Sequence, residues 1–243
     1  SFQFAFDVDW NKNLRLLTGM NPLGSQYNLE RGGTFTTPAI LYTYSKQGKG
    51  EASRRFHRWA MANAIRDAVK DRPVLLNNWE ATHCDFDEDR LKQLFDGARQ
   101  VGAELFLLDD GWFGNGPYSR DDDKHGLGDW DPSTKKLPKG LSYIAKEALK
   151  RKVGFGIWLE PEMVNPQSEL YQKHPDWIIT QSKREPILGR HQEILDLTRP
   201  EVQAFEWDII DKTLRPNPNI TYVKWDCNRY ITQPGSSYLQ PAD

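Results

Sequence analysis

The chain has 243 residues, of which 38% are hydrophobic and 27% are charged, and its formal net charge is −2. This is an ordinary globular composition with room for one or two domains. A nucleic acid or an acidic membrane is not an expected partner, because either would need a concentrated basic surface, and no apolar run approaches the roughly 18 residues of a membrane span.

The first ten residues, SFQFAFDVDW, contain neither the charged start nor the apolar run of a signal peptide, and they lack an initiator Met. We therefore expect a cut end inside a longer protein. The compartment stays open between a cytoplasmic and an exported bacterial protein. Cys84 and Cys227 form neither a disulfide framework nor a zinc-binding spacing, so two free thiols and no cofactor are expected.

Residues 1–50 carry two strand-like patterns. Apolar and polar side chains alternate from Phe2 to Trp10, which predicts a strand with one buried face. TPAILYTYS, residues 37–45, is a second strand candidate. We interpret residues 1–50 as the C-terminal part of an antiparallel β-sandwich domain, and residues 51–72 as a linking helix that ends before Pro73.

Residues 73–243 alternate apolar runs with amphipathic helical patterns. The five runs are VLLNNW, ELFLLDDGW, VGFGIWLEPE, EILDLT and YVKWD. Helices are expected at 86–102, at 141–152, around 168–174 and at 199–214, the last with Thr198 as its cap and Pro200 in its first turn.

This alternation predicts an α/β fold in which helices cover a parallel sheet. A doubly wound nucleotide-binding sheet would need a glycine-rich turn after its first strand. NNWEATHCD follows instead, which makes a doubly wound phosphate binder a weak reading and favours a (β/α)8 barrel. Five strands do not close such a barrel, so residues 73–243 are expected to form an incomplete one.

Polar and aromatic side chains follow the predicted strands, at the face where such barrels build active sites. Asp109 and Asp110 are adjacent carboxylates that repel each other unless a partner binds them. Lys224 and Asp226 are two residues apart on a strand and therefore face the same way. The lysine would keep the aspartate ionised, which suits a nucleophile. The other strand-end residues are Trp79, Glu80, Trp158, Glu160, Glu162 and Asn228, with Arg190 just ahead of the fourth run.

Five motifs in order resemble a retaining α-galactosidase of glycoside hydrolase family 36. They are LLNNWEA, LDDGWFG, GIWLEPEMVN, GRHQ with LDLTRPEV, and VKWDCNR. The resemblance covers nearly the whole chain, including the end of the family's N-terminal β-supersandwich domain. It implies hydrolysis of terminal α-1,6-linked galactose from raffinose-type oligosaccharides, and a full-length protein that forms a homo-oligomer, often a tetramer.

The resemblance also implies roles for individual residues. Asp226 matches the nucleophile that forms the covalent galactosyl intermediate. The matching substrate-binding residues are Trp79, Asp109, Asp110, Trp158, Arg190, Lys224 and Asn228. Cys227 stands where the family usually has methionine, and no loss of chemistry is expected from that. The acid/base of the family is an aspartate on a later strand, which this sequence lacks, so the chain alone is expected to be inactive.

Two alternatives remain open. One is a related retaining α-glycosidase or galactosyltransferase, such as an α-N-acetylgalactosaminidase or a raffinose synthase. The other is an inactive carbohydrate-binding fragment, against which the presence of both Lys224 and Asp226 argues.

Two other groups of acidic residues are expected to have structural roles. The acidic stretch Asp121–Asp131 does not match a calcium-binding loop, so a solvated or covering loop is expected. Glu160 and Glu162 flank Pro161, and we interpret them as hydrogen-bonding partners of neighbouring loops.

Overall fold

The computed structural model describes residues 2–21, 27–181 and 183–239. The chain divides into two compact units, with the boundary between Arg72 and Pro73.

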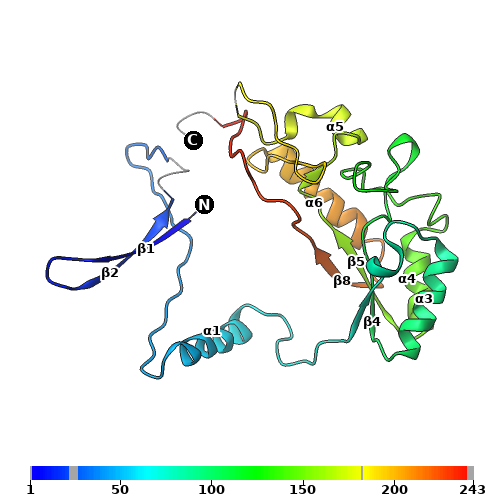
Figure 1. Cartoon of the computed structure of the whole chain (residues 1–243), viewed down its shortest axis with the longest axis horizontal. Helices are drawn as coiled ribbons and strands as arrows, with labels where there is room; N and C mark the ends of the chain where they lie inside the picture. The colour runs from blue at the N-terminus through cyan, green and yellow to red at the C-terminus, as the bar shows by residue number, and fades with distance from the viewer. Residues whose placement is uncertain (1, 22–26, 182, 240–243) are drawn as a thin grey trace. The chain divides into compact units, whose positions relative to one another are not determined.

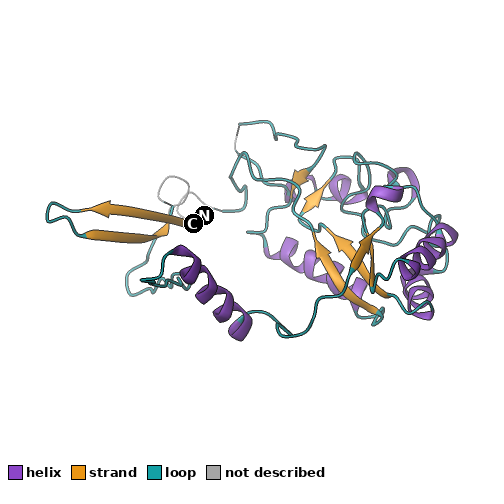
Figure 2. Ribbon diagram, turned by 60° about the horizontal axis from the view of Figure 1, so that its bottom comes forward, coloured by secondary structure: helices purple, strands orange, loops and turns teal. Residues whose placement is uncertain are grey.

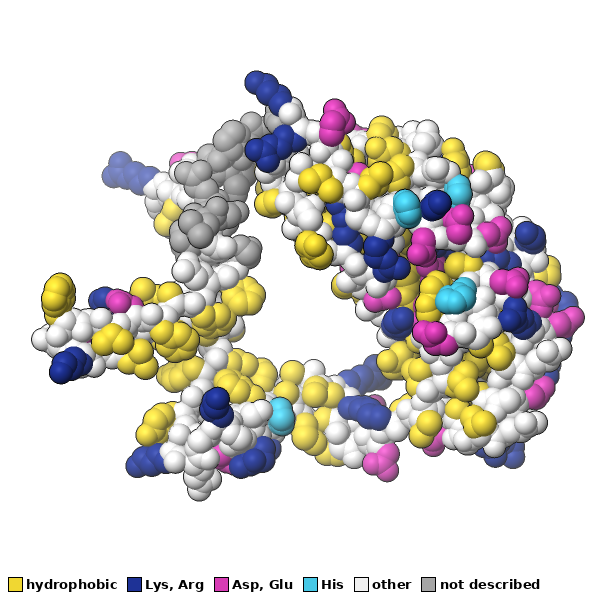
Figure 3. Space-filling view, in the orientation of Figure 1, with side chains coloured by type: hydrophobic (Ala, Val, Ile, Leu, Met, Phe, Trp, Pro, Cys, Tyr) yellow, Lys and Arg dark blue, Asp and Glu magenta, His cyan; other side chains and the backbone are white. Residues whose placement is uncertain are grey.

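The first unit begins with an antiparallel hairpin. Strand β1, Phe2–Val8, pairs with β2, Leu14–Met20, in a register that sets Phe2 opposite Met20 and Val8 opposite Leu14. The predicted strand is therefore present, but the expected buried face is not. Phe2, Phe6 and Val8 are exposed, and Figure 3 shows the hydrophobic side chains along the hairpin. A two-stranded hairpin buries a face only when another layer packs on it, and no described residue does so.

Two other expectations for this unit are wrong. Residues 37–45 form no strand, because no described segment pairs with them and an extended segment needs a partner for its backbone groups. Helix α1 runs from Lys49 to Asn63 and not across 51–72. Both Ala64 and Ile65 donate to the carbonyl of Ala60, which closes the helix. The turns that follow include Asp67 at a positive φ of 52°, outside the helical region.

The second unit contains a four-stranded parallel sheet. Its strands are β3 (Leu75–Asn77), β4 (Leu105–Leu108), β5 (Gly154–Leu159) and β8 (Ile220–Trp225), in the order β3-β4-β5-β8. Every pairing is parallel, and the sheet is open (Figure 1). The α/β class and the incomplete barrel are confirmed, but with four strands in this sheet instead of five.

The fifth predicted strand, the EILDLT run, does not join this parallel sheet. Its strand, β7 (Glu193–Ile194), pairs antiparallel with β6 (Met163–Val164), which lies in the segment after β5. The backbone N–H of Leu195 donates to the backbone carbonyl of Glu162, and the N–H of Asp196 donates to the carbonyl of Trp177. These loop partners satisfy the run's backbone, so it does not enter the parallel ladder.

Helices follow the strands and complete the unit. They are α2 (Trp79–Thr82), α3 (Glu88–Gln100), α4 (Gly140–Lys150), α5 (Glu169–Lys173) and α6 (Pro200–Leu214), with short 3-10 turns η1 (Gly116–Tyr118) and η2 (Pro175–Trp177). Figure 2 shows the helices flanking the sheet. One core joins them: Phe95 of α3 meets Phe106 and Phe155 edge to face, at 4.7 and 6.1 Å.

The helix ends partly follow the sequence signals. Pro200 is the first residue of α6, as expected, but Thr198 does not cap that helix. Its hydroxyl instead donates to Asp196 over 2.6 Å. In α3 the side chain of Asp87 accepts the N–H of Arg90 over 2.8 Å, which is a standard N-cap. Among the described residues, no helix has the length and apolarity to cross a bilayer.

Candidate active site

The C-terminal ends of the parallel strands bring four of the expected site residues into one network. Lys224 lies opposite Trp158 in the β5–β8 ladder. Its Nζ is 2.9 Å from Asp109 Oδ2 and 3.5 Å from Asp226 Oδ2. The indole N–H of Trp158 donates to the same oxygen of Asp226 over 2.9 Å. Three strands thus contribute to one carboxylate–ammonium–carboxylate array.

The environment of Asp226 keeps its carboxylate ionised. Partial burial acts to raise the pKa of Asp226, but hydrogen bonds from Trp158 and Asn228 and the charge of Lys224 together lower it below its ordinary value. Burial likewise acts to lower the pKa of Lys224, and Asp109 and Asp226 raise it above its usual value. At neutral pH the pair is therefore an anion beside a cation, as the spacing predicted.

Asp109 is held by the end of the first strand. Asn77 of β3 donates its side-chain N–H to Asp109 over 2.5 Å, and the side chain of Asn78 accepts the backbone N–H of Asp109 over 2.7 Å. Asp109 in turn accepts the N–H of Asp110 over 2.9 Å. The two asparagines were not among the expected site residues, although their place at a strand end was a usable signal.

Asp110 is neutralised by a residue that sequence reasoning missed. Arg120 forms a two-pronged contact with its carboxylate, with Nε–Oδ1 at 2.9 Å and Nη2–Oδ2 at 2.6 Å. Both side chains are almost fully buried. The adjacent aspartates therefore avoid repulsion by having separate cations, Lys224 for Asp109 and Arg120 for Asp110.

Arg120 is fixed by the loop that carries it. Its Nη1 donates to the side chain of Asn165 over 3.0 Å and to the carbonyl of His125 over 3.1 Å. Lys136 donates to the carbonyl of Arg120 over 2.7 Å and to that of Gly111 over 2.9 Å. The sequence offered no signal for this: Arg120 lies in a loop without periodicity, ten residues from its partner.

The turn after Asp110 requires glycine. Gly111 has a φ of +105°, and a Cβ built there would lie 2.9 Å from the Cα of Cys84. The close approach buries Cys84, and that burial raises the pKa of its thiol to about 12. Cys84 is a free thiol, and so is the exposed Cys227, as expected.

Arg190 is attached to this network indirectly. It lies at a positive φ of 52° in the turn before β7. Its guanidinium is 3.8 Å from Asp123, and Asp123 is also 3.8 Å from Arg120. A carboxylate thus links Arg190 to the Arg120–Asp110 pair, and nearly half of the Arg190 side chain stays exposed.

The two expected aromatic residues differ in their surroundings. Trp79 begins α2, is half-buried and meets His83 edge to face at 4.8 Å. Among the described residues, it is tied to the network through its backbone N–H, which donates to the side chain of Asn77 over 2.8 Å. Trp158 is only 2% exposed and packs against Phe113 and Trp130. Its indole N–H, more than its ring face, is what it presents to the site.

The last expected residue, Asn228, follows Asp226 by two residues. Its backbone N–H donates to Glu160 over 2.6 Å, and its side chain acts to lower the pKa of Asp226. Glu162 accepts from Trp225 over 2.9 Å and from the Cys227 thiol over 3.1 Å. The interpretation of both glutamates as loop-binding groups is confirmed.

The acidic stretch Asp121–Asp131 forms a loop held by Lys136, by His125 and by backbone N–H groups. Asp121 lies 3.0 Å from Lys136, and Asp122 lies 2.7 Å from His125. Asp129 accepts two backbone N–H groups at the start of α5. Within the described residues, no three His, Cys, Asp or Glu side chains are grouped as a metal site.

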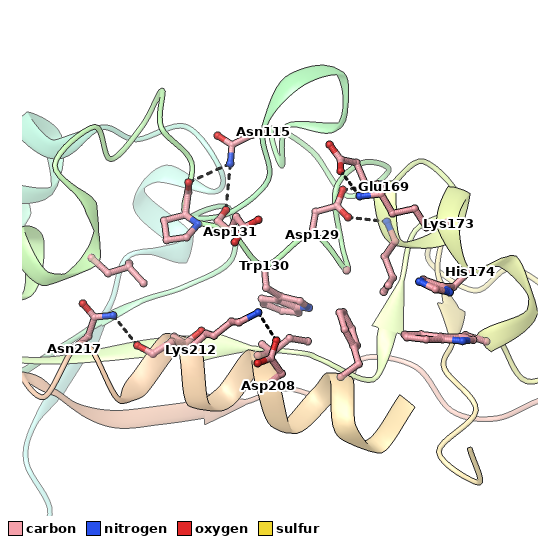
Figure 4. Close-up of a pocket in the computed structure, with 18 residues that line it drawn as sticks. Asn115, Asp129, Trp130, Asp131, Glu169, Lys173, His174, Asp208, Lys212 and Asn217 are labelled. Atoms are coloured by element: carbon pink, nitrogen blue, oxygen red, sulfur yellow. Dashed lines mark hydrogen bonds and ion pairs between the residues drawn. The ribbon is translucent and has the colours of Figure 1, made fainter. Parts of the chain in front are cut away.

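A cavity of about 370 Å³ lies away from the strand ends, between the loop 128–132, α5 and α6 (Figure 4). Ion pairs flank it: Lys212 with Asp208 at 2.5 Å and Lys173 with Glu169 at 2.8 Å. None of the expected site residues lines it. Trp130, which does, packs against Trp158. The cavity belongs to the helical layer, and the reactive groups lie outside it.

Comparisons with known proteins agree on one family. A profile of the melibiase family matches residues 34–243. The α-galactosidase AgaA of Geobacillus stearothermophilus is 42% identical over 243 residues, which cover 99% of this chain and 33% of that protein. α-Galactosidase C of Emericella nidulans is 41% identical over 227 residues, 89% of this chain and 30% of that protein.

Solved structures give the same result. A GH36 AgaA variant in complex with raffinose has a TM-score of 0.88 at 40% identity, covering 99% of this chain and 33% of that one. The α-galactosidase of Lactobacillus brevis has a TM-score of 0.88 at 40% identity, over 99% and 32%. The chain spans about a third of the length of these relatives. Its sequence and its fold together show that this chain belongs to the melibiase family and shares its architecture with the GH36 α-galactosidases.

Proposed function

We propose that the protein containing this chain is a retaining α-galactosidase in which Asp226 is the nucleophile. The observation that carries the proposal is the state of Asp226: an ionised carboxylate at a strand end, with Lys224 3.5 Å away and the Trp158 N–H at 2.9 Å. Relatives named α-galactosidases, and a raffinose complex among the solved structures, support the substrate class.

The reaction would proceed in two displacements. An oxygen of Asp226 attacks the anomeric carbon as the glycosidic bond breaks, and a second carboxyl group protonates the leaving oxygen. Water then cleaves the galactosyl ester, and the second group takes the proton from that water. Retention requires the two carboxyl groups to lie roughly 5–5.5 Å apart. As the resemblance implies, we assign the second group to a part of the protein outside residues 1–243.

The remaining network residues suit a galactose ring with several hydroxyl groups. We assign the 4- and 6-hydroxyls to Asp109 and Asp110, in line with the resemblance. Asp109 already accepts from Asn77, Asp110 and Lys224, and a carboxylate has about four acceptor positions. Capacity for a sugar hydroxyl therefore remains.

Other hydroxyl contacts are assigned to Lys224, Arg190 and Asn228, and Trp79 to the apolar face of the sugar. The preferred substrate would be a raffinose-type oligosaccharide with a terminal α-1,6-linked galactose. A homo-oligomer, such as a tetramer, is the assembly that we propose for the full-length protein.

The test uses the full-length protein and p-nitrophenyl α-galactoside. We expect hydrolysis with α-galactose as the first product by NMR, and loss of turnover in Asp226→Ala. Added azide should restore cleavage in that variant and give β-galactosyl azide, because the small anion occupies the space of the missing carboxylate. Asp208→Ala, an exposed acid on α6, is the control and should retain activity.

Three results would change the assignment. Inverted product would exclude the covalent route. Activity in Asp226→Ala without azide would exclude Asp226 as the nucleophile. Preference for an α-N-acetylgalactosaminide, or transfer to sucrose in place of hydrolysis, would favour the related enzymes considered above.

A further inference from the structure

Glu160 is a buried acid that the proposed reaction does not use. It follows β5 directly and is 0% exposed. Its Oε1 accepts the backbone N–H of Asn228 over 2.6 Å, and its Oε2 lies 3.4 Å from the side-chain N of Gln192. Across the described chain no Lys or Arg forms an ion pair with it, whereas Asp110 and Asp109 each have a cation. Burying a carboxyl group without a cation lowers the stability of the folded protein. The groups that Glu160 contacts are therefore the place to look for its role.

The segment that Glu160 holds is the turn that carries the nucleophile. Regular pairing of β5 with β8 stops at Trp225. The next N–H, of Asp226, donates to the carbonyl of Leu159 over 2.8 Å, and that of Cys227 donates to the Asp226 side chain over 3.1 Å. Beyond these, the N–H of Asn228 meets Glu160. Glu160 thus adds one more contact between the end of β5 and residues 226–228, beyond the last residue pair of the β5–β8 ladder.

This hold supports the turn that carries a further donor to Asp226. The backbone N–H of Cys227 donates to Asp226 Oδ1 over 3.1 Å and helps to keep the pKa of Asp226 low. Residues 226–230 have no regular secondary structure, so no strand or helix pattern fixes this turn. The 2.6 Å bond from Asn228 to Glu160 ties it to the end of β5.

We propose, on the basis of the proposed function, that Glu160 is a positioning residue for the nucleophile: by accepting the N–H of Asn228 it sets the turn in which the Cys227 N–H donates to Asp226.

For this positioning role Glu160 needs a hydrogen-bond acceptor and not a negative charge. Burial, opposed by the bond from Asn228 and assisted by the charges of Asp226 and Asp110, raises the pKa of Glu160 to about 7. The protonated form still accepts at Oε1. Its proton would lie on Oε2, beside Gln192, whose Oε1 is buried without a partner and could accept that proton with the amide turned round. The groups that face Glu160 are thus Asp226, Asp110, Asn228 and Gln192.

The experiment measures pH profiles of kcat and kcat/KM for three variants of the full-length enzyme. Glu160→Gln keeps an acceptor in the same place, and Glu160→Met has similar length without one. Glu206→Gln removes another buried acid, on α6, and is the matched control. Asp226→Ala is assayed alongside, and thermal unfolding shows that each variant is folded.

Glu160→Met should lower kcat by about 10- to 100-fold, the scale of a displaced reacting group, with KM near the parent value. The acid limb of its kcat/KM profile should move to higher pH, because the turn is released and Asp226 loses the Cys227 N–H bond. Glu160→Gln and the control should stay within about threefold of the parent, with the limb unmoved.

The direction of the shift separates the two explanations of a defect. If Glu160 acted through its charge, its removal would lower the pKa of Asp226 and move the limb to lower pH. That result, parent-like kinetics in Glu160→Met, or loss of activity in folded Glu160→Gln would each overturn the positioning role. If Glu160→Met does not fold, Glu160→Leu, which also lacks an acceptor, takes its place with the same expectations. Activity in Asp226→Ala would instead count against the proposed function, whatever Glu160 does.

Discussion

At the scale of single residues, the state of one carboxylate depends on groups from three strands. Trp158 is both a buried core residue and the donor of a 2.9 Å hydrogen bond to Asp226. Lys224 forms ion pairs with both Asp109 and Asp226. Partial burial by itself would raise the pKa of Asp226, and these donors more than offset that effect.

Trp158→Phe should raise the pKa of Asp226 towards its ordinary value and so move the acid limb of kcat/KM to higher pH. The ring is largely kept, so the packing against Phe113 and Trp130 survives, but the N–H donor is lost. Kinetics of the full-length protein between pH 3 and pH 9 would measure the shift. A parent-like limb would mean that the indole N–H does not stabilise the ionised form. Trp207→Phe, at an exposed position of α6, is the matched control.

At the scale of elements, α6 departs from a simple amphipathic helix. Val202 and Ile209 face the core as the spacing predicted, but Glu206 lies between them and is 9% exposed. One of its carboxyl oxygens is buried without a partner. Burial, with the nearby charge of Glu162, raises the pKa of Glu206 from 4.5 to about 7. The folded helix therefore holds a proton that the unfolded chain releases at lower pH.

The sign of the pH effect follows from this shift. Because the folded-state pKa lies above the unfolded value, the native protein loses stability as the pH rises from about 4.5 to about 7. Glu206→Gln lacks this loss, so its urea midpoint should exceed that of the parent at pH 8 and match it near pH 4. Urea titrations of the full-length protein at both values would measure the difference. Equal midpoints at pH 8 would show that Glu206 is ionised at no cost. Asp208→Asn, an exposed acid on the same helix, is the control.

At the scale of the whole chain, the two units differ in how much core they have. Residues 73–239 share a large buried cluster across the sheet and its helices. The hairpin and α1 of the first unit bury no large hydrophobic side chain. Residues 64–73, which join the units, are exposed apart from the half-buried Ala68 and contain no helix or strand. Exposed, irregular segments are where proteolysis concentrates.

Limited trypsin digestion of the 243-residue chain should therefore cut between the two units after Arg66 or Lys70, since Arg72 is followed by Pro73. Mass spectrometry should find a lasting fragment that begins at Asp67 or Asp71. The double variant Arg66→Gln and Lys70→Gln should delay its appearance. Early cuts inside α3, α4 or α6 would contradict the stability of the second unit.

The sequence by itself determined the elements whose signals are local. Periodicity predicted α3, α4 and α6, apolar runs predicted the four sheet strands, and parallel order alone brought Lys224 and Asp226 to the same end of the sheet as Asp109. Local signals failed where a segment's partner decided its structure. β7 is apolar enough for the parallel sheet, yet its backbone bonds go to β6 and to the loop after β5. The hydrophobic face of β1 is buried only if another layer covers it.

Which polar groups meet depends on the tertiary structure. Arg120 with Asp110, and Glu160 with Asn228, join loops through side-chain geometry that no residue pattern encodes. The periodicity of a strand or helix predicts which of its faces is buried. It does not predict where the hydrogen-bond donors and acceptors of a loop lie in the fold. The strand ends were therefore predictable as the place where these polar side chains meet, and the contacts that fix their protonation states were not.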